Sequence, residues 1–262
     1  MDLIKSHPSL SQHPLMGGDL KTLYRALKTY GGVSAHAYGH LGAVLGSAIG
    51  RTPFRWLERW KVRNMKPAVE LESPIFIVGY WRSGTTHLHN LLGQSPEFGI
   101  ITPIASGLPG ELLTLATWLE PLLEKGLPED RGVDEVAVTP QSPQEDEIPL
   151  ANMQPLSVFH ALYFGRNFRE NFNKGVFFES ADSHEIKEWQ MSVRYFYGKI
   201  ARHQSRQPLL IKNPVYTARI DMLKKMWPDA RFIHIYRNPY TVYHSTVNYY
   251  HNMLDKLSLQ RY

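Results

Sequence analysis

Three short apolar runs stand out in a chain whose other segments mix apolar and polar residues. They are Ile75–Val78, Leu209–Ile211 and Phe232–Tyr236. A strand buried on both faces has this character, because neither of its sides meets water. Segments with helical spacing of apolar residues lie between the runs, and strands joined through a crossover helix pair in parallel. The pattern therefore predicts a parallel sheet covered by helices.

Several of the predicted helices carry recognisable start signals. A helix is expected to begin at Thr85, after a glycine-bounded loop, and Asp182 with Glu185 has the spacing of a capping box that opens a long amphipathic helix. Asn238 is placed as an N-cap with a proline in the next position, so residues 240–250 are expected to be helical.

The N-terminal part is predicted to be all helical. Asp19 can cap a first helix, and a second helix of small residues is expected over residues 34–49. Thr52 followed by Pro53 has the form of an N-cap and a first-turn proline, which predicts a separate third helix over residues 54–63.

The predicted third helix interleaves aromatic and basic side chains between Phe54 and Trp60. A basic aromatic helix can lie on an anionic membrane surface. The alternative is that the aromatic side chains pack against the sheet while the basic face stays in solvent. The sequence leaves both open: packing on the core, or peripheral membrane contact through Phe54–Trp60.

Together the elements predict an α/β fold, a P-loop-NTPase-like parallel sheet flanked by helices, with a helical N-terminal extension. We place the extension at residues 1–66, packed on the core, and the α/β core at residues 67–262. A chain of 262 residues is long enough for such a domain.

Composition narrows the classes of function. The chain has no cysteine, which excludes disulfides, zinc–thiolate sites and a thiol nucleophile and fits a reducing compartment, so we expect a cytoplasmic protein that is peripheral if it meets a membrane. The formal net charge of +5 suits anionic ligands. Lysine and arginine are scattered singly, so no nucleic-acid partner is expected.

The loop after the first predicted strand has the form of an anion site. Gly79 and Gly84 are separated by four residues, as in the P-loop pattern, and backbone N–H groups of such a loop and helix N-terminus converge on one spot. Thr85 stands in the place of the P-loop lysine, Thr86 keeps the hydroxyl, and Arg82 is the loop's cation. This favours a phosphate-bearing donor other than ATP; the alternative is a tight turn with a surface arginine.

Cations follow all three predicted strands. Ligands of open parallel sheets bind at the carboxyl ends of the strands, where Arg82, Lys212 and Arg237 lie in the sequence. Unless this placement is due to chance, it predicts a three-cation pocket for a donor with at least two anionic groups. Three adjacent carboxylates, Glu145 to Glu147, form either a solvated surface or the place of a general base.

Two motifs resemble those of sulfotransferases that use 3′-phosphoadenosine 5′-phosphosulfate (PAPS), in the bacterial branch related to protein-tyrosine and carbohydrate sulfotransferases. Residues 81–86, Trp-Arg-Ser-Gly-Thr-Thr, resemble the 5′-phosphosulfate loop. Arg237-Asn238-Pro239, with Ser245 eight residues after the arginine, resembles the 3′-phosphate motif. Lys212-Asn213-Pro214 is similar to a Lys-x-Pro element of the family, and residues 144–147 resemble a segment of the bacterial branch.

The resemblance implies roles for individual residues. The residues that would bind the donor are Arg82, Ser83, Gly84, Thr85 and Thr86 at the 5′-phosphosulfate, and Arg237 and Ser245 at the 3′-phosphate. Arg82 and Lys212 would also be catalytic, because charge grows on the leaving phosphate in a loose transition state. No metal is required.

The base that removes the acceptor's proton is less well marked. The tyrosine-protein branch has an acidic base just after the first helix, but residues 99–103 contain none here. Our candidates are therefore Glu145 and Glu147, with His87 as an outside candidate. Family members usually continue past the second motif, so a chain ending at Tyr262 is expected to be truncated or a minimal variant.

We predict an enzyme, a PAPS-dependent sulfotransferase that acts on a hydroxyl of a small molecule, sugar or lipid and releases adenosine 3′,5′-bisphosphate. One alternative is a P-loop-type small-molecule or nucleotide kinase, against which the missing lysine argues. The other is a non-catalytic nucleotide-binding module that keeps the anion loop without a working base.

Overall fold

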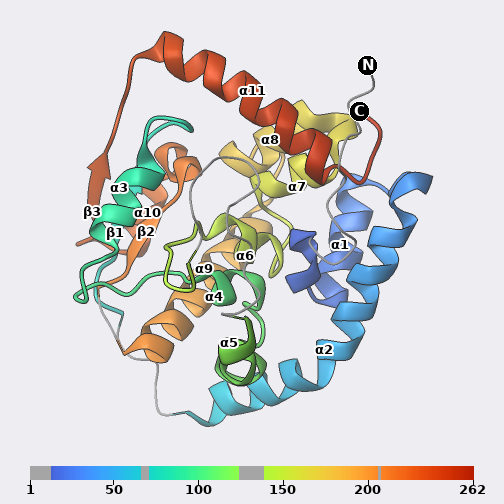
Figure 1. The fold of residues 1–262 in the computed structure, drawn as a ribbon, viewed down its shortest axis with the longest axis horizontal. Coiled ribbons are helices and arrows are strands. Elements are labelled where there is room, and N and C mark those ends of the chain that lie inside the picture. Colours follow the sequence, from blue (N-terminus) through green and yellow to red (C-terminus); the bar gives the residue numbers. More distant parts are fainter. Residues whose placement is uncertain (1–12, 66–70, 124–138, 206–207) are drawn as a thin grey trace.

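The structure is a computed structural model that describes residues 13–65, 71–123, 139–205 and 208–262. The predicted boundary between extension and core, at residues 66 and 67, lies outside the described residues. A three-stranded parallel sheet in the order β2-β1-β3 stands among helices that dominate the molecule (Figure 1). The predicted α/β fold class is confirmed.

The strands are short and their carboxyl ends lie level. β1 (Ile75–Val78) is in the centre, and its four residues are buried, as predicted. β2 (Leu210–Lys212) and β3 (Arg231–His234) each lie within one or two residues of their predicted bounds. Pairing of Ile77 with Lys212 and of Val78 with His234 brings all three strand ends to one edge of the sheet.

Eleven helices are described besides shorter helical turns. They are α1 (Leu20–Tyr30), α2 (Tyr38–Asn64), α3 (Thr85–Leu92), α4 (Pro103–Gly107), α5 (Thr117–Leu123), α6 (Glu147–Ala151), α7 (Val158–Tyr163), α8 (Phe168–Phe177), α9 (Ser183–Gln204), α10 (Ile220–Met226) and α11 (Pro239–Leu257). The turns are η1 (Pro14–Gly17), η2 (Ala35–Ala37), η3 (Leu112–Ala116), η4 (Gly165–Asn167) and η5 (Pro214–Ala218). Figure 1 shows α11 crossing from the sheet side of the molecule to the side of α1 and α2.

Three of the predicted helix starts are confirmed, at α3, α9 and α11. α3 begins at Thr85, and the capping box of α9 is formed, with the Glu185 N–H donating to Asp182 at 2.8 Å and the Asp182 N–H donating back to the Glu185 carboxylate at 3.1 Å. Asn238 caps α11 by accepting from the N–H of Tyr240 at 3.0 Å. These contacts join residues within one helical turn, so they depend little on the rest of the fold.

The predicted break at Thr52 is wrong, because α2 is one continuous helix of 27 residues with Pro53 inside it. The Thr52 hydroxyl donates to a carbonyl one turn earlier instead of capping a new helix. Buried ion pairs of Arg51 and Arg55 with Glu111, each at 2.8 Å, hold the segment on both sides of the proline. These tertiary contacts outweigh the roughly 3 kcal/mol that proline costs in a helix interior.

The same contacts turn arginine side chains of this segment toward the interior and leave large apolar side chains in solvent. The guanidinium of Arg55 is buried, whereas Trp56, Leu57 and Trp60 are 67%, 50% and 64% exposed. The expected packing of the aromatic side chains on the sheet is therefore wrong for Trp56 and Trp60. The expected solvated basic face exists at Arg59, Lys61 and Arg63 but not at Arg51 and Arg55. In the described ranges, no helix has the length and apolar character needed to cross a bilayer.

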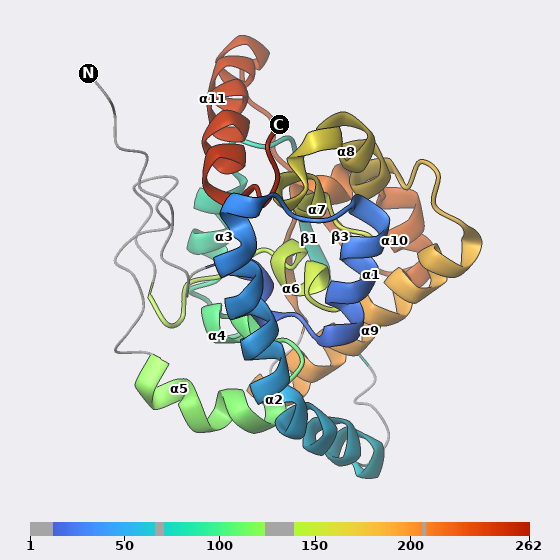
Figure 2. The same ribbon diagram turned by 90° about the vertical axis from the view of Figure 1, so that its right-hand side faces the viewer.

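The two largest of the three apolar clusters in the described residues join the layers. One packs β1 through Phe76 and Val78 against α9 residues that include Trp189 and Phe196. The other joins α1 and α2 to α7, α8 and α11, and Figure 2 shows α1 and α2 together along one side of the molecule. The first cluster fixes the sheet edge that carries the predicted site.

Candidate active site

The turn after β1 is tightly enclosed by its neighbours. Gly79 has a φ of 148°, and a Cβ at this position would lie 2.3 Å from the carbonyl oxygen of Ile235, just beyond β3. Its N–H donates to the hydroxyl of Thr217 at 2.9 Å. Arg82 and Gly84 also have positive φ values, 66° and 100°. The turn thus has a fixed shape that only glycine can adopt at its first position.

The N-terminus of α3 is arranged to receive an anion. Gly84 is its N-cap and supplies no side-chain hydrogen bond, so the first-turn N–H groups of Thr85 and Thr86 are not capped by a side chain at that position. Such N–H groups, together with the helix dipole, favour a phosphate or sulfate group. The backbone of the loop therefore agrees with its residue types, because Gly79 and Gly84 have positive φ values and α3 begins directly after Gly84.

Arg82 joins the first motif to the second. Its Nε donates to the hydroxyl of Ser245 at 3.0 Å, between residues 163 positions apart in the chain. Its guanidinium also lies 5.8 Å from the ring centre of Tyr249, within the range of a cation–π contact. α11 therefore carries the second motif directly against the first.

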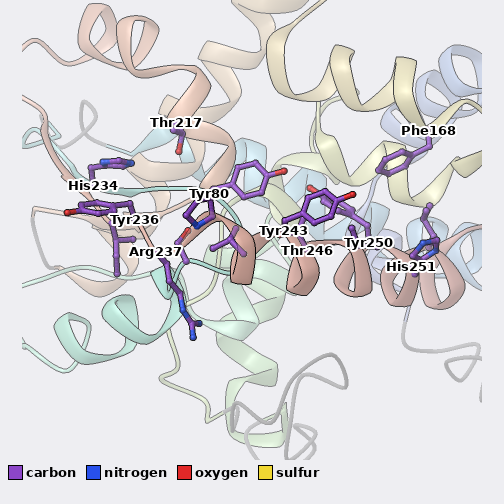
Figure 3. A pocket seen from close by; sticks show the side chains of 16 residues that line it. Tyr80, Phe168, Thr217, His234, Tyr236, Arg237, Tyr243, Thr246, Tyr250 and His251 are labelled. Carbon is purple, nitrogen blue, oxygen red and sulfur yellow. The ribbon is translucent and has the colours of Figure 1, made fainter.

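A cavity of about 740 Å³ borders both turns. Tyr80 and Ser83 line it from the turn after β1, and Arg237 lines it from the connection after β3. Arg237 is exposed, and Figure 3 shows its side chain extending away from the rings of His234 and Tyr236. The remaining wall is mostly apolar and includes Phe168, Val242, Tyr243, Val247, Tyr250 and Leu254.

Lys212 lies at the carboxyl end of β2, an outer strand of the sheet. It is fully buried, and its Nζ donates to the hydroxyl of Thr86 at 3.2 Å and to the carboxylate of Glu145. Glu145 is 22% exposed at its side chain. A buried ammonium that lies between the carboxylate of Glu145 and the hydroxyl of Thr86 can stabilise negative charge that develops beside it.

The other two carboxylates of the cluster lie behind this pair. Asp146 and Glu147 are fully buried and both accept from the side-chain amide of Asn213, at 2.8 and 2.7 Å. Burial, and next the charge of Glu147, raise the pKa of Asp146 to about 7, while hydrogen bonds from Tyr197, Tyr216 and Asn213 act in the opposite direction. Asp146 therefore titrates in the neutral range.

The structure brings part of the predicted set together. Arg82 meets Ser245, and Lys212 meets both Thr86 and Glu145. Glu147 is enclosed, with its oxygens on Asn213 and on the N–H of Val158, so in this arrangement no acceptor reaches it. The outside candidate His87 is exposed on α3.

Four residues of the site were not identified from the sequence: Asn213, Asp146, Tyr197 and Tyr216. The first two stand directly beside residues that were singled out, but which neighbour of Lys212 or Glu145 matters depends on tertiary contacts. Tyr197 has the spacing of a core residue of α9, and nothing in the sequence distinguishes it from one. In the part of the chain that the structure describes, no histidine, cysteine or carboxylate group of three is arranged to hold a metal ion.

A family model for the sulfotransferase family matches residues 74–262 of this chain. The chain belongs to this family. The omega-hydroxy-beta-dihydromenaquinone-9 sulfotransferases Stf3 of Mycobacterium bovis and Mycobacterium tuberculosis are each 32% identical to it over 186 residues. That match covers 71% of this chain and 47% of each relative, so the chain spans about half the length of these sulfotransferases.

Two solved sulfotransferases have a similar fold. The sulfotransferase STF1 from Mycobacterium tuberculosis aligns with a TM-score of 0.55 and 21% identity, over 85% of this chain and 61% of the other. STF9 from Mycobacterium avium aligns with a TM-score of 0.58 and 16% identity, over 90% and 67%. The sulfotransferase assignment predicted from the two motifs is confirmed.

Proposed function

We propose that this sulfotransferase moves a sulfuryl group from PAPS to a hydroxyl of a lipid-like acceptor. The observation that carries the proposal is the hydrogen bond between Arg82 and Ser245, because it joins a 5′-type and a 3′-type anion motif at one edge of the sheet. The uncapped N-terminus of α3 and the adjoining cavity fit a ligand with two separate anionic groups.

Bound PAPS supplies the sulfuryl group and, as leaving group, adenosine 3′,5′-bisphosphate. The α3 amides and Arg82 orient the 5′ end, and Arg237 and Ser245 hold the 3′-phosphate. Lys212, already placed against Thr86, stabilises the charge that grows on the leaving oxygen. Because these groups are preorganised, they need little rearrangement as that charge develops.

Glu145 is our proposed general base. It is the only carboxylate of the acidic cluster, Glu145 to Glu147, that is partly exposed, and it lies beside Lys212 at the sheet edge. From this place it takes the proton of the acceptor hydroxyl as the new O–S bond forms. The sequence candidate Glu147 is fully buried, which favours Glu145 of the two.

The name of the mycobacterial relatives suggests the acceptor class. Their name gives an omega-hydroxy-beta-dihydromenaquinone-9 as the acceptor, and we extend a lipid-like hydroxyl acceptor to this chain. Contact with a membrane surface through the exposed Trp56, Leu57 and Trp60 belongs to the same proposal. A cytoplasmic location remains a prediction.

The decisive experiment compares donors and then acceptors. Calorimetric titration is expected to give tighter binding of adenosine 3′,5′-bisphosphate than of ATP, with no requirement for magnesium. Transfer of labelled sulfate from PAPS to a hydroxylated prenylquinone is then measured by chromatography. Magnesium-dependent turnover of ATP instead would establish a kinase, and nucleotide binding without transfer to any hydroxyl acceptor would establish a binding module.

A further inference from the structure

The acidic segment offers Lys212 three consecutive carboxylates, and the ion pair described at Lys212 is with the first of them, Glu145. Glu145 pairs with the ammonium, whereas Asp146 and Glu147 face the buried side. Carboxylates one residue apart have similar affinity for an ammonium, so charge alone does not select Glu145. Something else must fix the position of the segment along the end of β2.

Asn213 makes that selection in the geometry observed. One amide nitrogen donates to Asp146 at 2.8 Å and to Glu147 at 2.7 Å, which uses both of its protons. The amide oxygen accepts from the N–H of Val215 at 2.9 Å and so fixes the orientation of the amide through the cap of η5. The forked donor therefore recognises two adjacent carboxylates at once.

Three further donors hold the same two carboxylates. The hydroxyl of Tyr197 donates to Asp146 at 2.7 Å, and the hydroxyl of Tyr216 donates to the same oxygen. Glu147 accepts from the N–H of Val158, at the start of α7, at 3.1 Å. The donors come from β2–η5, α9 and α7, so a shift of the acidic segment by one residue would break contacts to three separate elements.

We infer that Asn213 and Asp146 are positioning residues for catalysis. The buried hydrogen bonds from Asn213 to Asp146 and Glu147 fix where the acidic segment lies along the end of β2, and this keeps Glu145 paired with Lys212. Lys212 and Asn213 are neighbours in one chain segment, and Glu145 and Asp146 are neighbours in another. The Lys212–Glu145 ion pair and the Asn213–Asp146 hydrogen bond therefore join the same two segments at consecutive residues. The inference rests on the proposed function in assigning a catalytic role to Glu145 and Lys212.

The first test is kinetic and uses Asn213→Ser, which removes the forked amide but keeps an oxygen that can accept from Val215. With PAPS and a hydroxylated prenylquinone, kcat is expected to fall at least tenfold while the Kd of adenosine 3′,5′-bisphosphate changes less than twofold. Asp146→Asn is expected to lower kcat and to leave the Kd of the nucleotide unchanged in the same way as Asn213→Ser. Full activity in both variants, or an equal loss of nucleotide affinity, would overturn the inference.

A pair of tyrosine variants controls for loss of packing. Tyr197→Phe deletes a hydroxyl that donates to Asp146, and we expect kcat to fall threefold to tenfold. Tyr163 is equally buried, but its hydroxyl finds no hydrogen-bond partner in the described residues, so Tyr163→Phe is expected to leave kcat unchanged. Equal losses in the two variants would show a general effect of packing and contradict a positioning role.

The second test needs no acceptor. The coupling between Lys212→Met and Glu145→Gln is measured from urea unfolding of the single and double variants, first in the parent chain and then with Asn213→Ser. Loss of the coupling in the Asn213→Ser background is expected, and an unchanged coupling overturns the inference. If coupling is lost but no acceptor is sulfated, the register role stands and the proposed function fails.

Discussion

The cations that follow the three strands lie in different surroundings. Lys212 is fully buried and paired with Glu145, Arg82 is half-buried against Ser245, and Arg237 is exposed. Removing one partner of a buried pair leaves an uncompensated charge and typically costs 3–5 kcal/mol of stability, roughly, whereas an exposed cation is lost with little effect on folding. Arg237 therefore gives the cleanest test of ligand binding.

Arg237→Ala is expected to weaken binding of adenosine 3′,5′-bisphosphate by about 1.5–3 kcal/mol, the usual scale for a hydrogen bond to a charged group. Adenosine 5′-phosphate, which lacks the 3′-phosphate, should bind the variant and the parent alike. Both affinities are measured by calorimetry. Arg231→Ala, at the opposite end of β3, is the matched control and should bind both ligands normally; equal losses of the two ligands in Arg237→Ala would refute the 3′-phosphate role.

The raised pKa of Asp146 makes stability depend on pH. In the folded chain this carboxyl keeps its proton up to about pH 7, whereas in the unfolded chain it releases it near its usual value of 3.8. Between these limits the folded state binds more protons, so the contribution of Asp146 to the free energy of unfolding falls as pH rises. Asp146→Asn removes this contribution.

Urea unfolding of the parent and Asp146→Asn between pH 4.5 and 8 measures this effect. The difference between the two unfolding free energies, plotted against pH, should have a slope that approaches the value for one bound proton up to about pH 7 and should then level off. Tyr197, Tyr216 and the buried histidines elsewhere remain in both proteins, so subtraction isolates Asp146 together with its charge interaction with Glu147. Parallel curves over the whole range would contradict the raised pKa.

Several secondary-structure elements begin and end where their local sequence signals predict. β1, the start of α3 and the capping box of α9 were all predicted, because each depends on an apolar run or on hydrogen bonds within a turn. α2 departs from its local signal at Thr52-Pro53 because ion pairs from α2 to Glu111 act across 60 and 56 residues of sequence. The local signal therefore failed where buried ion pairs decide whether the helix continues.

The need for glycine in the turn after β1 can be tested by substitution at Gly79. Gly79→Ala places a Cβ 2.3 Å from the Ile235 carbonyl oxygen at a φ of 148° and should lower the free energy of unfolding by about 2–4 kcal/mol. Gly46→Ala is the control, because it lies inside α2 with open space around it and should stabilise the chain by up to about 1 kcal/mol. Chemical denaturation of both variants decides between strain at Gly79 and a general effect of removing glycine.

For the molecule as a whole, the exposed aromatic residues of α2 allow the proposed contact with a membrane surface to be tested. Replacing Trp56 and Trp60 together by alanine should weaken binding to phosphatidylglycerol-containing vesicles about tenfold or more, because indole rings stabilise contact at the headgroup level. Cosedimentation measures the binding. Tyr24→Ala on α1, which is also 67% exposed, is the control and should bind normally; unchanged binding of the tryptophan variant would rule out this surface.

The sequence alone determined the parallel sheet, the glycine-bounded turn from Gly79 to Gly84 and the start of α3 at Thr85. These features depend on apolar runs, glycine positions and caps, all of which act over a few residues. Only the tertiary structure decided that Arg51 and Arg55 of α2 face inward and that Glu145, rather than Glu147, forms the ion pair with Lys212. Those outcomes depend on which buried charges find partners on distant segments, because an unpaired buried charge costs more free energy than any local preference can offset.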